Sequence, residues 1–251
     1  MILYKYMSSR ALSATISGLT VRFTAPYFFN DPFDCAISNY RSEEKHDFVN
    51  LNNSLRIMYN RHRLGALCLT RAPFNLLMWA HYGENHKGAV VGIDTTCAGL
   101  DCSESNIITA QSGSVIYTSV RPSTAGVELP QEVNSTSDRA TLEKMFLHKS
   151  IHWAYEEEVR ILRIINQEYD EFTIFNNSMA HRDVKIPKEA IKEIYLGSRF
   201  EPTDDNKKIV KTISNDFQLD KFARCYLDQV KWDIRAKAIT KSLAELGIYF
   251  F

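Results

Sequence analysis

The 251-residue chain lacks several features that commonly reveal a protein's class from sequence. Its 30 basic and 30 acidic residues cancel, so no overall field would attract a polyanion. No apolar run approaches the roughly 18 residues of a membrane span. The first residues, MILYKYMSSR, lack the basic start and apolar run of a signal peptide. We therefore expect a cytoplasmic protein without a membrane partner.

Cysteine is scarce and poorly placed for a metal site. Only Cys97 and Cys102 of the five cysteines lie close together, and no second pair or neighbouring histidine completes a zinc pattern. The odd number also argues against a disulfide framework. We expect free thiols in a reducing compartment and no metal ion.

Four familiar motifs are also missing. The chain contains no G-x-G-x-x-G, no G-x-x-x-x-G-K-[ST], no H-E-x-x-H and no G-x-S-x-G. A nucleotide bound by this protein would be held without a Rossmann turn or a P-loop.

What is present is ordinary globular composition, 45% hydrophobic and 24% charged, without repeats, low-complexity tracts or a clear linker. We predict one α+β domain over residues 1–251, with a mobile loop at 120–134. Alternation and helical spacing of apolar residues give the expected elements. Strands are expected at 2–6, 19–24, 64–70, 88–93, 113–119, the end of 151–165, 172–175 and 191–197, with one or two more within 223–239. Helices are expected at 8–18, 46–62, 135–150 and 204–214, and a short helix or turn at 78–82.

An aromatic loop, FTAPYFFNDPFD, follows the second predicted strand at residues 23–34. It is too apolar for a linker and too interrupted by proline for a long strand or helix. Asn30, Asp31 and Asp34, together with the two prolines, predict Asx and proline turns. The loop is either a rigid turn that caps the sheet or a preorganised binding surface.

The sequence YEEEVR, residues 155–160, is the sharpest local feature. If the chain enters a strand here, Glu156, Glu158 and Arg160 alternate onto one face, about 7 Å apart. One interpretation is a structural ion pair between Arg160 and a glutamate. The other is that one carboxylate performs chemistry while the second activates a nucleophile and Arg160 holds the geometry.

A third segment, MWAHYGENHKG, covers residues 78–88. His81 and His86 do not share a helical face, so a metal site is not expected. The spacing of Met78, Trp79 and Tyr82 is typical of a packed helical face. The alternative is a pocket wall built from Trp79, His81 and Tyr82.

Taken in order, ILYKY, FTAPYFFNDPFD, MWAHYGENHKG, FLHKSIHWAYEEEVR and AIKEIYLG resemble a large bacterial family of uncharacterised proteins. The family's marks are a YKY start, an FNDPFD loop, an MW-x-HY-x-x-x-HKG segment and a W-x-x-E-x-E-x-R strand. The resemblance runs through nearly the whole chain and implies no activity by itself.

The layout also resembles the ADP-ribosyltransferase fold, an α+β fold with a split antiparallel β-sheet core and flanking helices. In that fold two early strands contact NAD, and a late strand carries the catalytic glutamate, often within E-x-E. By order along the chain, the resemblance assigns NAD contacts to Tyr4, Lys5 and Tyr6 on the first strand and to Thr24 and Tyr27 at the second. The late position corresponds to Glu156 and Glu158. The chain departs from the standard pattern in having Tyr-Lys-Tyr on the first strand and no S-T-S on the second.

Under this resemblance the chemistry is the cleavage of the nicotinamide-ribose bond of NAD. Glu158 would stabilise the oxocarbenium-like centre, and Glu156 would orient or deprotonate the acceptor. Tyr27, Phe28 or Trp79 would offer an aromatic face to the cationic nicotinamide. The other residues expected to contact NAD are Asn30, Trp79, His81, Tyr82 and Arg160. The cation that binds the pyrophosphate would be Lys5, Arg22 or Lys87.

The expected function is therefore an NAD-dependent mono-ADP-ribosyltransferase toxin with a macromolecular acceptor. We favour RNA or DNA over protein, because the loop resembles that of DNA-modifying toxins and residues 182–251 hold fourteen basic against eleven acidic residues. Such an enzyme implies an antitoxin partner, in a toxin-antitoxin or phage-defence system. The alternatives are a nuclease, in which His81 or His86 assists E-x-E-x-R, and a non-catalytic nucleotide-binding sensor module.

Overall fold

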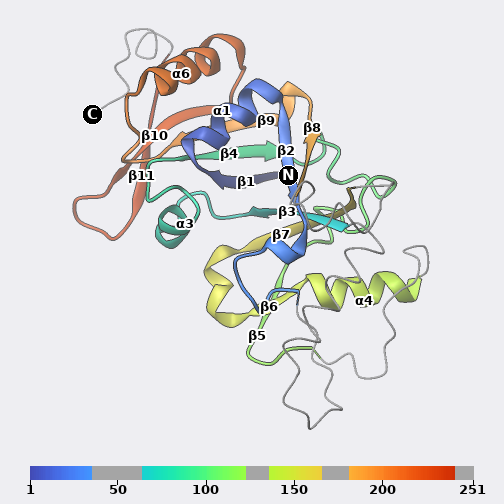
Figure 1. The fold of residues 1–251 in the computed structure, drawn as a ribbon. Helices are drawn as coiled ribbons and strands as arrows, with labels where there is room; N and C mark the ends of the chain where they lie inside the picture. Colours follow the sequence, from blue (N-terminus) through green and yellow to red (C-terminus); the bar gives the residue numbers. More distant parts are fainter. Residues whose placement is uncertain (36–63, 123–135, 166–180, 241–251) are drawn as a thin grey trace. The chain divides into compact units, whose positions relative to one another are not determined.

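The computed structural model describes residues 1–35, 64–122, 136–165 and 181–240 and shows a mixed α+β protein (Figure 1). The chain divides into two compact units. Unit 1 comprises Met1–Val21, Leu69–Gly99 and Lys185–Phe251, and unit 2 comprises Arg22–Cys68 and Leu100–Val184. The expectation of one domain over the whole chain stays a prediction.

Unit 1 is built on a mostly antiparallel sheet. Its strands lie in the order β11 (Ile234–Ala238), β10 (Lys221–Leu227), β9 (Ile191–Leu196), β4 (Ala89–Asp94) and β1 (Ile2–Met7). Only β9 and β10 run parallel. In β4 the run AVVGI is buried throughout, as expected for a central strand covered on both faces.

Helices of unit 1 begin at residues whose side chains cap the first turn. They are α1 (Ser9–Gly18), α3 (Leu76–His81) and α6 (Asp204–Asp216), with the 3₁₀ turn η3 (Lys188–Ala190) before β9. The Ser8 hydroxyl accepts from the Ala11 N–H at 3.2 Å, and α1 ends at Gly18 as predicted. Thr203 caps α6 in the same way. The buried faces of these helices follow their apolar spacing, and α1 packs against α6 and β4.

Unit 2 is organised around β7 (Glu158–Ile164), which is covered on both edges. One edge pairs with β3 (Leu64–Thr70). On the other edge the Arg160 N–H donates to the Gly113 carbonyl at 2.8 Å and the Leu162 N–H to the Ile108 carbonyl at 3.0 Å. Because both edges are occupied, the side chains at the start of β7 are held in fixed positions.

The other elements in the described residues of unit 2 are short apart from one helix. They are η1 (Pro26–Phe28), β5 (Ile116–Thr118), α4 (Thr136–Phe146), β6 (His148–Ser150) and η2 (Ile151–Glu156). β5 and β6 pair in parallel. Three further strands, β2 (Thr20–Thr24), β3 and β8 (His181–Lys185), contain residues of both units.

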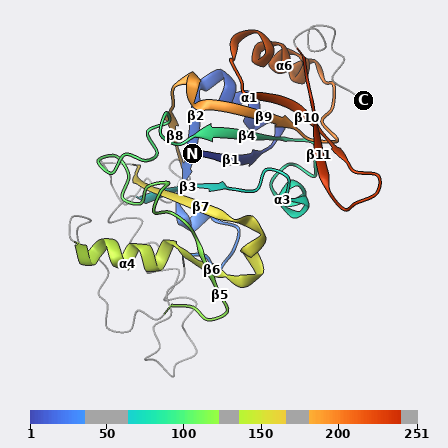
Figure 2. The same ribbon diagram turned by 180° about the vertical axis from the view of Figure 1, so that it is seen from behind.

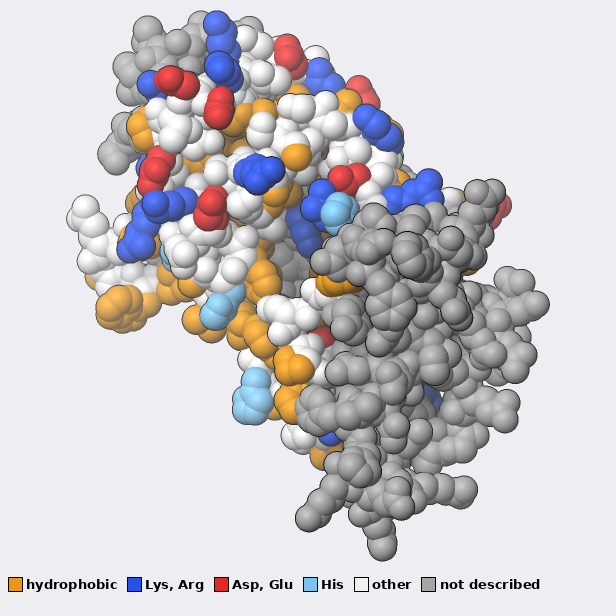
Figure 3. Space-filling view, viewed as in Figure 1, with side chains coloured by type: hydrophobic (Ala, Val, Ile, Leu, Met, Phe, Trp, Pro, Cys, Tyr) orange, Lys and Arg blue, Asp and Glu red, His pale blue; other side chains and the backbone are white. Residues whose placement is uncertain are grey.

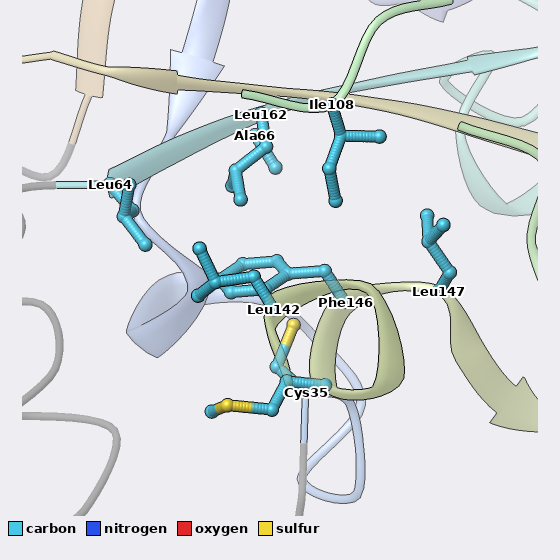
Figure 4. Packing of buried hydrophobic residues seen from close by; sticks show 9 residues of the cluster. Cys35, Leu64, Ala66, Ile108, Leu142, Phe146, Leu147 and Leu162 are labelled. Atoms are coloured by element: carbon cyan, nitrogen blue, oxygen red, sulfur yellow. The ribbon is translucent and has the colours of Figure 1, made fainter. Parts of the chain in front are cut away.

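A hydrophobic core lies between β7 and α4 in unit 2 (Figure 4). Leu142 and Phe146, one turn apart on α4, face Ile108 and Leu162, and all four are fully buried. Leu64, Ala66 and Cys35 complete the packing. This core attaches α4, and the strand β6 that follows it, to β7.

The observed elements confirm most of the predicted ones, and the main differences among the described residues lie at β6 and β8. The predicted helix over 135–150 ends at Phe146, and residues 148–150 form β6, which the sequence did not suggest. Strand β8 was also missed. The predicted helix at 46–62, the strand at 172–175 and most of the loop at 120–134 lie outside the described residues. In the part of the chain that is described, no helix is long and apolar enough to cross a membrane.

Candidate functional site

Five charged side chains are buried together in unit 2, and we call them the charge cluster: Asp34, Lys149, Glu156, Glu158 and Arg160. Their side chains are between 1% and 6% exposed. They come from the end of the aromatic loop, from β6, from the last residue of η2 and from the first residues of β7. Charged groups are almost never buried to this extent unless they are paired.

Arg160 is the anchor of the charge cluster. Its Nη1 and Nη2 donate to Oδ1 and Oδ2 of Asp34 at 2.6 and 2.7 Å, a bidentate pair. Its Nε and Nη2 donate to Oε1 and Oε2 of Glu158 at 2.8 and 2.9 Å. Nη1 also donates to the Phe146 carbonyl at 2.9 Å. The planar guanidinium thus joins the aromatic loop, α4 and β7.

Lys149 lies where the three carboxylates converge. Its Nζ is 2.5 Å from Glu156 Oε2, 3.0 Å from Glu158 Oε2 and 3.6 Å from Asp34 Oδ2. The ring of Trp153 lies 5.0 Å from the same nitrogen. Burial alone lowers the pKa of this lysine, but the attraction of the carboxylates outweighs it and raises the pKa above the usual value. Lys149 therefore stays charged.

Local backbone geometry explains how two glutamates two residues apart meet in one cluster. Glu157, between them, has a left-handed conformation with φ of 45° and is exposed, whereas Glu156 and Glu158 are buried. The turn at Glu157 ends η2 and starts β7. The N–H of Glu158 donates to the hydroxyl of Tyr117 at 2.8 Å, which fixes the first residue of the strand.

The charges of the cluster do not cancel. Three carboxylates face two cations, which leaves one net negative charge on these five side chains. Burial raises the pKa of Glu158, but Arg160 and Lys149 more than reverse this and hold the pKa well below its usual range. Glu158 is thus a carboxylate that stays ionised in a buried, preorganised setting.

The aromatic loop is fixed by the turn chemistry that its sequence predicts. Asp31 Oδ1 accepts from the Phe33 N–H at 2.8 Å, and the Asp34 N–H donates to the Asp31 carbonyl at 3.0 Å. Asn30 is exposed. Tyr27 belongs to η1, and its side chain lies outside what the structure describes. The Asx turn is confirmed, and its effect is to place Asp34 against Arg160.

The predicted NAD contacts on the first strand belong to unit 1 and are engaged there. The Tyr4 hydroxyl donates to Glu193 at 3.0 Å, and the Tyr6 hydroxyl donates to the Ala72 carbonyl at 2.8 Å. Burial, followed by the bond to Glu193, raises the pKa of Tyr4 to about 12. Lys5 between them is half-buried.

The segment 78–88 also belongs to unit 1. Trp79 is fully buried, and its Nε1 donates to the Pro73 carbonyl at 3.0 Å, which confirms the predicted packed face of α3. His81 is exposed and Tyr82 half-buried. Three consecutive residues after the helix, 84–86, have positive φ, and the His86 ring stacks on Trp79 at 6.2 Å. Contacts of Trp79, His81 and Tyr82 with NAD stay a prediction.

The remaining predicted cations and polar groups have their own neighbours. Arg22 forms two hydrogen bonds with Asp183, at 2.8 and 3.0 Å, and Lys87 pairs with Glu201 at 2.5 Å; both pairs are exposed. Thr24 is half-buried at the end of β2 in unit 2.

The structure brings Glu156, Glu158 and Arg160 together, but not in the way the sequence suggested. The prediction that all three alternate along one strand is wrong for Glu156, which ends η2. It joins the other two because Lys149 bridges it to Glu158. Sequence reasoning missed Lys149, assigned to the end of a helix, and treated Asp34 as a turn residue only.

Among the described residues, no group of three or more histidine, cysteine, aspartate or glutamate side chains is arranged to hold a metal ion. Cys35, Cys97, Cys102 and Cys225 are free thiols. In the charge cluster, the place between the carboxylates is taken by the Lys149 ammonium group.

Comparison with known proteins gives a family match for part of the chain. Residues 78–161, about a third of the chain, match a family described as a protein of unknown function, DUF2971. The matched region contains four of the five cluster residues and ends immediately after Arg160. No curated protein matches the chain. No solved structure matches it either.

Proposed function

We propose that the protein is an NAD-dependent mono-ADP-ribosyltransferase whose acceptor is nucleic acid, with Glu158 as the catalytic carboxylate. The observation that supports this function is the buried carboxylate of Glu158, which Arg160 and Lys149 together keep ionised and oriented. A reaction that passes through a cationic centre is accelerated by a carboxylate of this kind, because its charge is oriented before the substrate arrives.

In the proposed reaction the bond between the ribose C1′ and the nicotinamide nitrogen breaks. Nicotinamide leaves as a neutral molecule with the bonding electron pair, and the ribose becomes oxocarbenium-like. An acceptor oxygen or nitrogen then attacks C1′ and loses its proton, which Glu156 accepts. Glu158 keeps its negative charge throughout, in agreement with its lowered pKa.

Both carboxylate oxygens of Glu158 accept hydrogen bonds, so the ribose hydroxyls must replace one partner. Lys149 is the partner that can leave, since it remains paired with Glu156 and faces Asp34. Arg160 is held more firmly, because it makes two hydrogen bonds to Glu158 and is fixed at the same time by Asp34 and the Phe146 carbonyl. Displacement of Lys149 would free one oxygen of the Glu158 carboxylate from that ammonium group for the substrate.

The test is release of labelled nicotinamide from NAD by the purified protein, with single-stranded DNA, RNA and protein extract offered as acceptors. Glu158→Gln removes the charge while keeping the shape, and we expect turnover to fall at least a hundredfold. Glu157→Gln is the matched control, since Glu157 is the adjacent exposed glutamate. We expect this control to retain the wild-type rate.

Two further observations complete the test. Melting curves of both variants show whether Glu158→Gln is folded; if it is not, Glu158→Asp, which keeps the charge but withdraws it by one methylene, replaces it. Absence of nicotinamide release with every acceptor contradicts the proposal. Shortening of RNA or DNA that depends on Mg²⁺ would identify a nuclease instead.

One observation favours a non-catalytic binding module as the second candidate. The charge cluster is paired throughout, as in a structural ion network, and Glu158 is only 5% exposed. In that case NAD or another nucleotide raises the melting temperature without being consumed. The same nicotinamide assay separates the two functions.

A further inference from the structure

The hairpin formed by β10 and β11 in unit 1 exposes apolar side chains that the fold does not use. Figures 1 and 2 show its tip projecting away from the rest of this unit. Trp232 is 97% exposed and Val230 92%, and Tyr226 and Leu227 are about half exposed. A tryptophan this exposed gains nothing from burial and contributes little to the stability of unit 1.

Basic residues alternate with these apolar ones. Residues 221–238 hold five lysines or arginines against two aspartates. Of these, Lys221 pairs with Glu193 and Arg235 with Asp228, and Arg224 is buried. Tyr226 lies directly opposite Arg235 in the register of the hairpin, and Arg224 lies opposite Lys237, so the four share one face. Lys231 is exposed between Val230 and Trp232 in the sequence. Figure 3 shows hydrophobic and basic side chains side by side at the left, over the hairpin.

The tip is held in shape by one acidic residue. Asp228 Oδ1 accepts from the N–H groups of Val230 and Lys231 at 2.8 and 2.9 Å, and Oδ2 pairs with Arg235 at 2.6 Å. The Asp228 N–H also donates to the Asp233 carbonyl at 3.0 Å. The exposed side chains are thus presented on an ordered backbone, which reduces the ordering cost of binding.

From these observations we infer that the β10–β11 hairpin binds single-stranded nucleic acid. Aromatic side chains that stack on bases, next to cations that follow the phosphates, are the features by which single strands are held without sequence preference. Trp232 and Tyr226 provide stacking surfaces, and the exposed Lys231 provides charge. An interface with another protein would explain the apolar residues but not the exposed lysine set among them.

The inference deepens the proposed function, since it identifies where an acceptor strand is held, and it rests on that function only for the transfer step. Binding to the hairpin needs no NAD and no residue of the charge cluster. The two proposals are therefore tested by separate measurements.

The experiment is fluorescence anisotropy with fluorescein-labelled twelve-nucleotide oligothymidine and oligouridine, without NAD, at several salt concentrations. We expect Trp232→Phe to bind nearly as well as the wild type, because it keeps the stacking face. Trp232→Leu keeps the apolar character but removes the stacking, and we expect its affinity to fall about tenfold. Lys231→Gln should make the affinity less dependent on salt, lowering the slope of log affinity against log salt concentration by about 0.7 in magnitude.

A control and a second readout complete the design. Lys208, exposed on α6 in the same unit, is the matched lysine, and Lys208→Gln should leave affinity and slope unchanged. Of the three tryptophans, Trp79 is fully buried and Trp153 half-buried, whereas Trp232 is almost fully exposed. Quenching of the tryptophan fluorescence by an added oligonucleotide therefore reports mainly on Trp232.

Each outcome decides one proposal. Equal affinity of Trp232→Leu and the wild type, no binding of either oligonucleotide, or self-association that Trp232→Leu abolishes would overturn the inference. Oligonucleotide binding without NAD turnover supports the nucleic-acid surface on the hairpin and contradicts the transferase function. NAD turnover, together with unchanged oligonucleotide affinity of the Trp232→Leu variant, supports the transferase function and contradicts the nucleic-acid surface on the hairpin.

Discussion

Arg160 shows how one side chain determines the arrangement of a site drawn from distant parts of the sequence. Its guanidinium is 126 residues from Asp34 in the chain, yet the two form a bidentate pair with both members almost fully buried. Burial of either charge without the other is strongly unfavourable, so each depends on its partner. The aromatic loop and β7 are consequently coupled through this pair.

Replacement of Asp34 by asparagine tests this coupling. Asp34→Asn leaves Arg160 buried with one neutral partner, and we expect the free energy of unfolding to fall by about 3 to 5 kcal/mol, as for other broken buried pairs. Urea denaturation measures the change. Asp31→Asn is the matched control in the same loop, because an asparagine oxygen can accept the hydrogen bond from the Phe33 N–H as well as an aspartate can. Equal losses in the two variants would contradict the role assigned to Arg160.

At the scale of the elements, the positions of β1 and β4 in unit 1 depend on a close backbone approach at Gly88. A Cβ atom on Gly88 would lie 2.1 Å from the carbonyl oxygen of Met7. Gly88 also donates its N–H to the Gly83 carbonyl at 2.9 Å, which closes the turn after α3. The glycine therefore allows the segment 78–88 to enter β4 directly beside the end of β1.

Gly88→Ala should therefore destabilise unit 1. We expect a loss of about 3 kcal/mol or more, because the atom that the new methyl group meets is backbone and cannot move without disturbing the β1–β4 pairing. Thermal unfolding followed by circular dichroism measures this. Gly18→Ala serves as comparison, since its Cβ would meet only the side chain of Thr20, at 3.2 Å, and we expect it to be close to neutral. A melting temperature of Gly88→Ala equal to that of the wild type would show that the backbone at Gly88 does not lie this close to the Met7 carbonyl.

At the scale of the whole molecule, the buried charges make stability depend on pH. Glu158 has a pKa lowered by Arg160 and Lys149 against the effect of burial. Its contribution is therefore complete above the unfolded pKa of about 4.3 and is lost as pH falls through the folded value. Lys149 and Arg160 have raised pKa values, so their contributions persist to high pH. The protein should be most stable across the neutral range.

Glu158→Gln should flatten the acid side of this profile. The variant lacks the carboxylate at every pH, so its free energy of unfolding at pH 7 is lower than that of the wild type. Between pH 6 and 3, however, its free energy of unfolding falls by less than that of the wild type. Urea midpoints measured across this range, with Glu157→Gln as the exposed control, test the difference. Parallel profiles for all three proteins would mean that Glu158 does not carry the acid dependence.

Local pattern was enough to predict many elements and part of the site. Alternation and capping predicted β1, α1, β2, β3 and α6, because these depend on neighbours in the chain. The Asx turn at Asp31 and the buried face of Trp79 followed from the same local rules. Proximity along the sequence also suggested that Glu156, Glu158 and Arg160 act together.

Only the tertiary structure decided which charges complete the site. Asp34 and Lys149 join the charge cluster through contacts with residues up to 126 positions away, which no local pattern encodes. The left-handed turn at Glu157 likewise arises where η2 meets β7, and it replaces the simple alternation that the sequence suggested. Burial then converts these separate charges into one coupled group, because charges interact far more strongly away from water than on the surface.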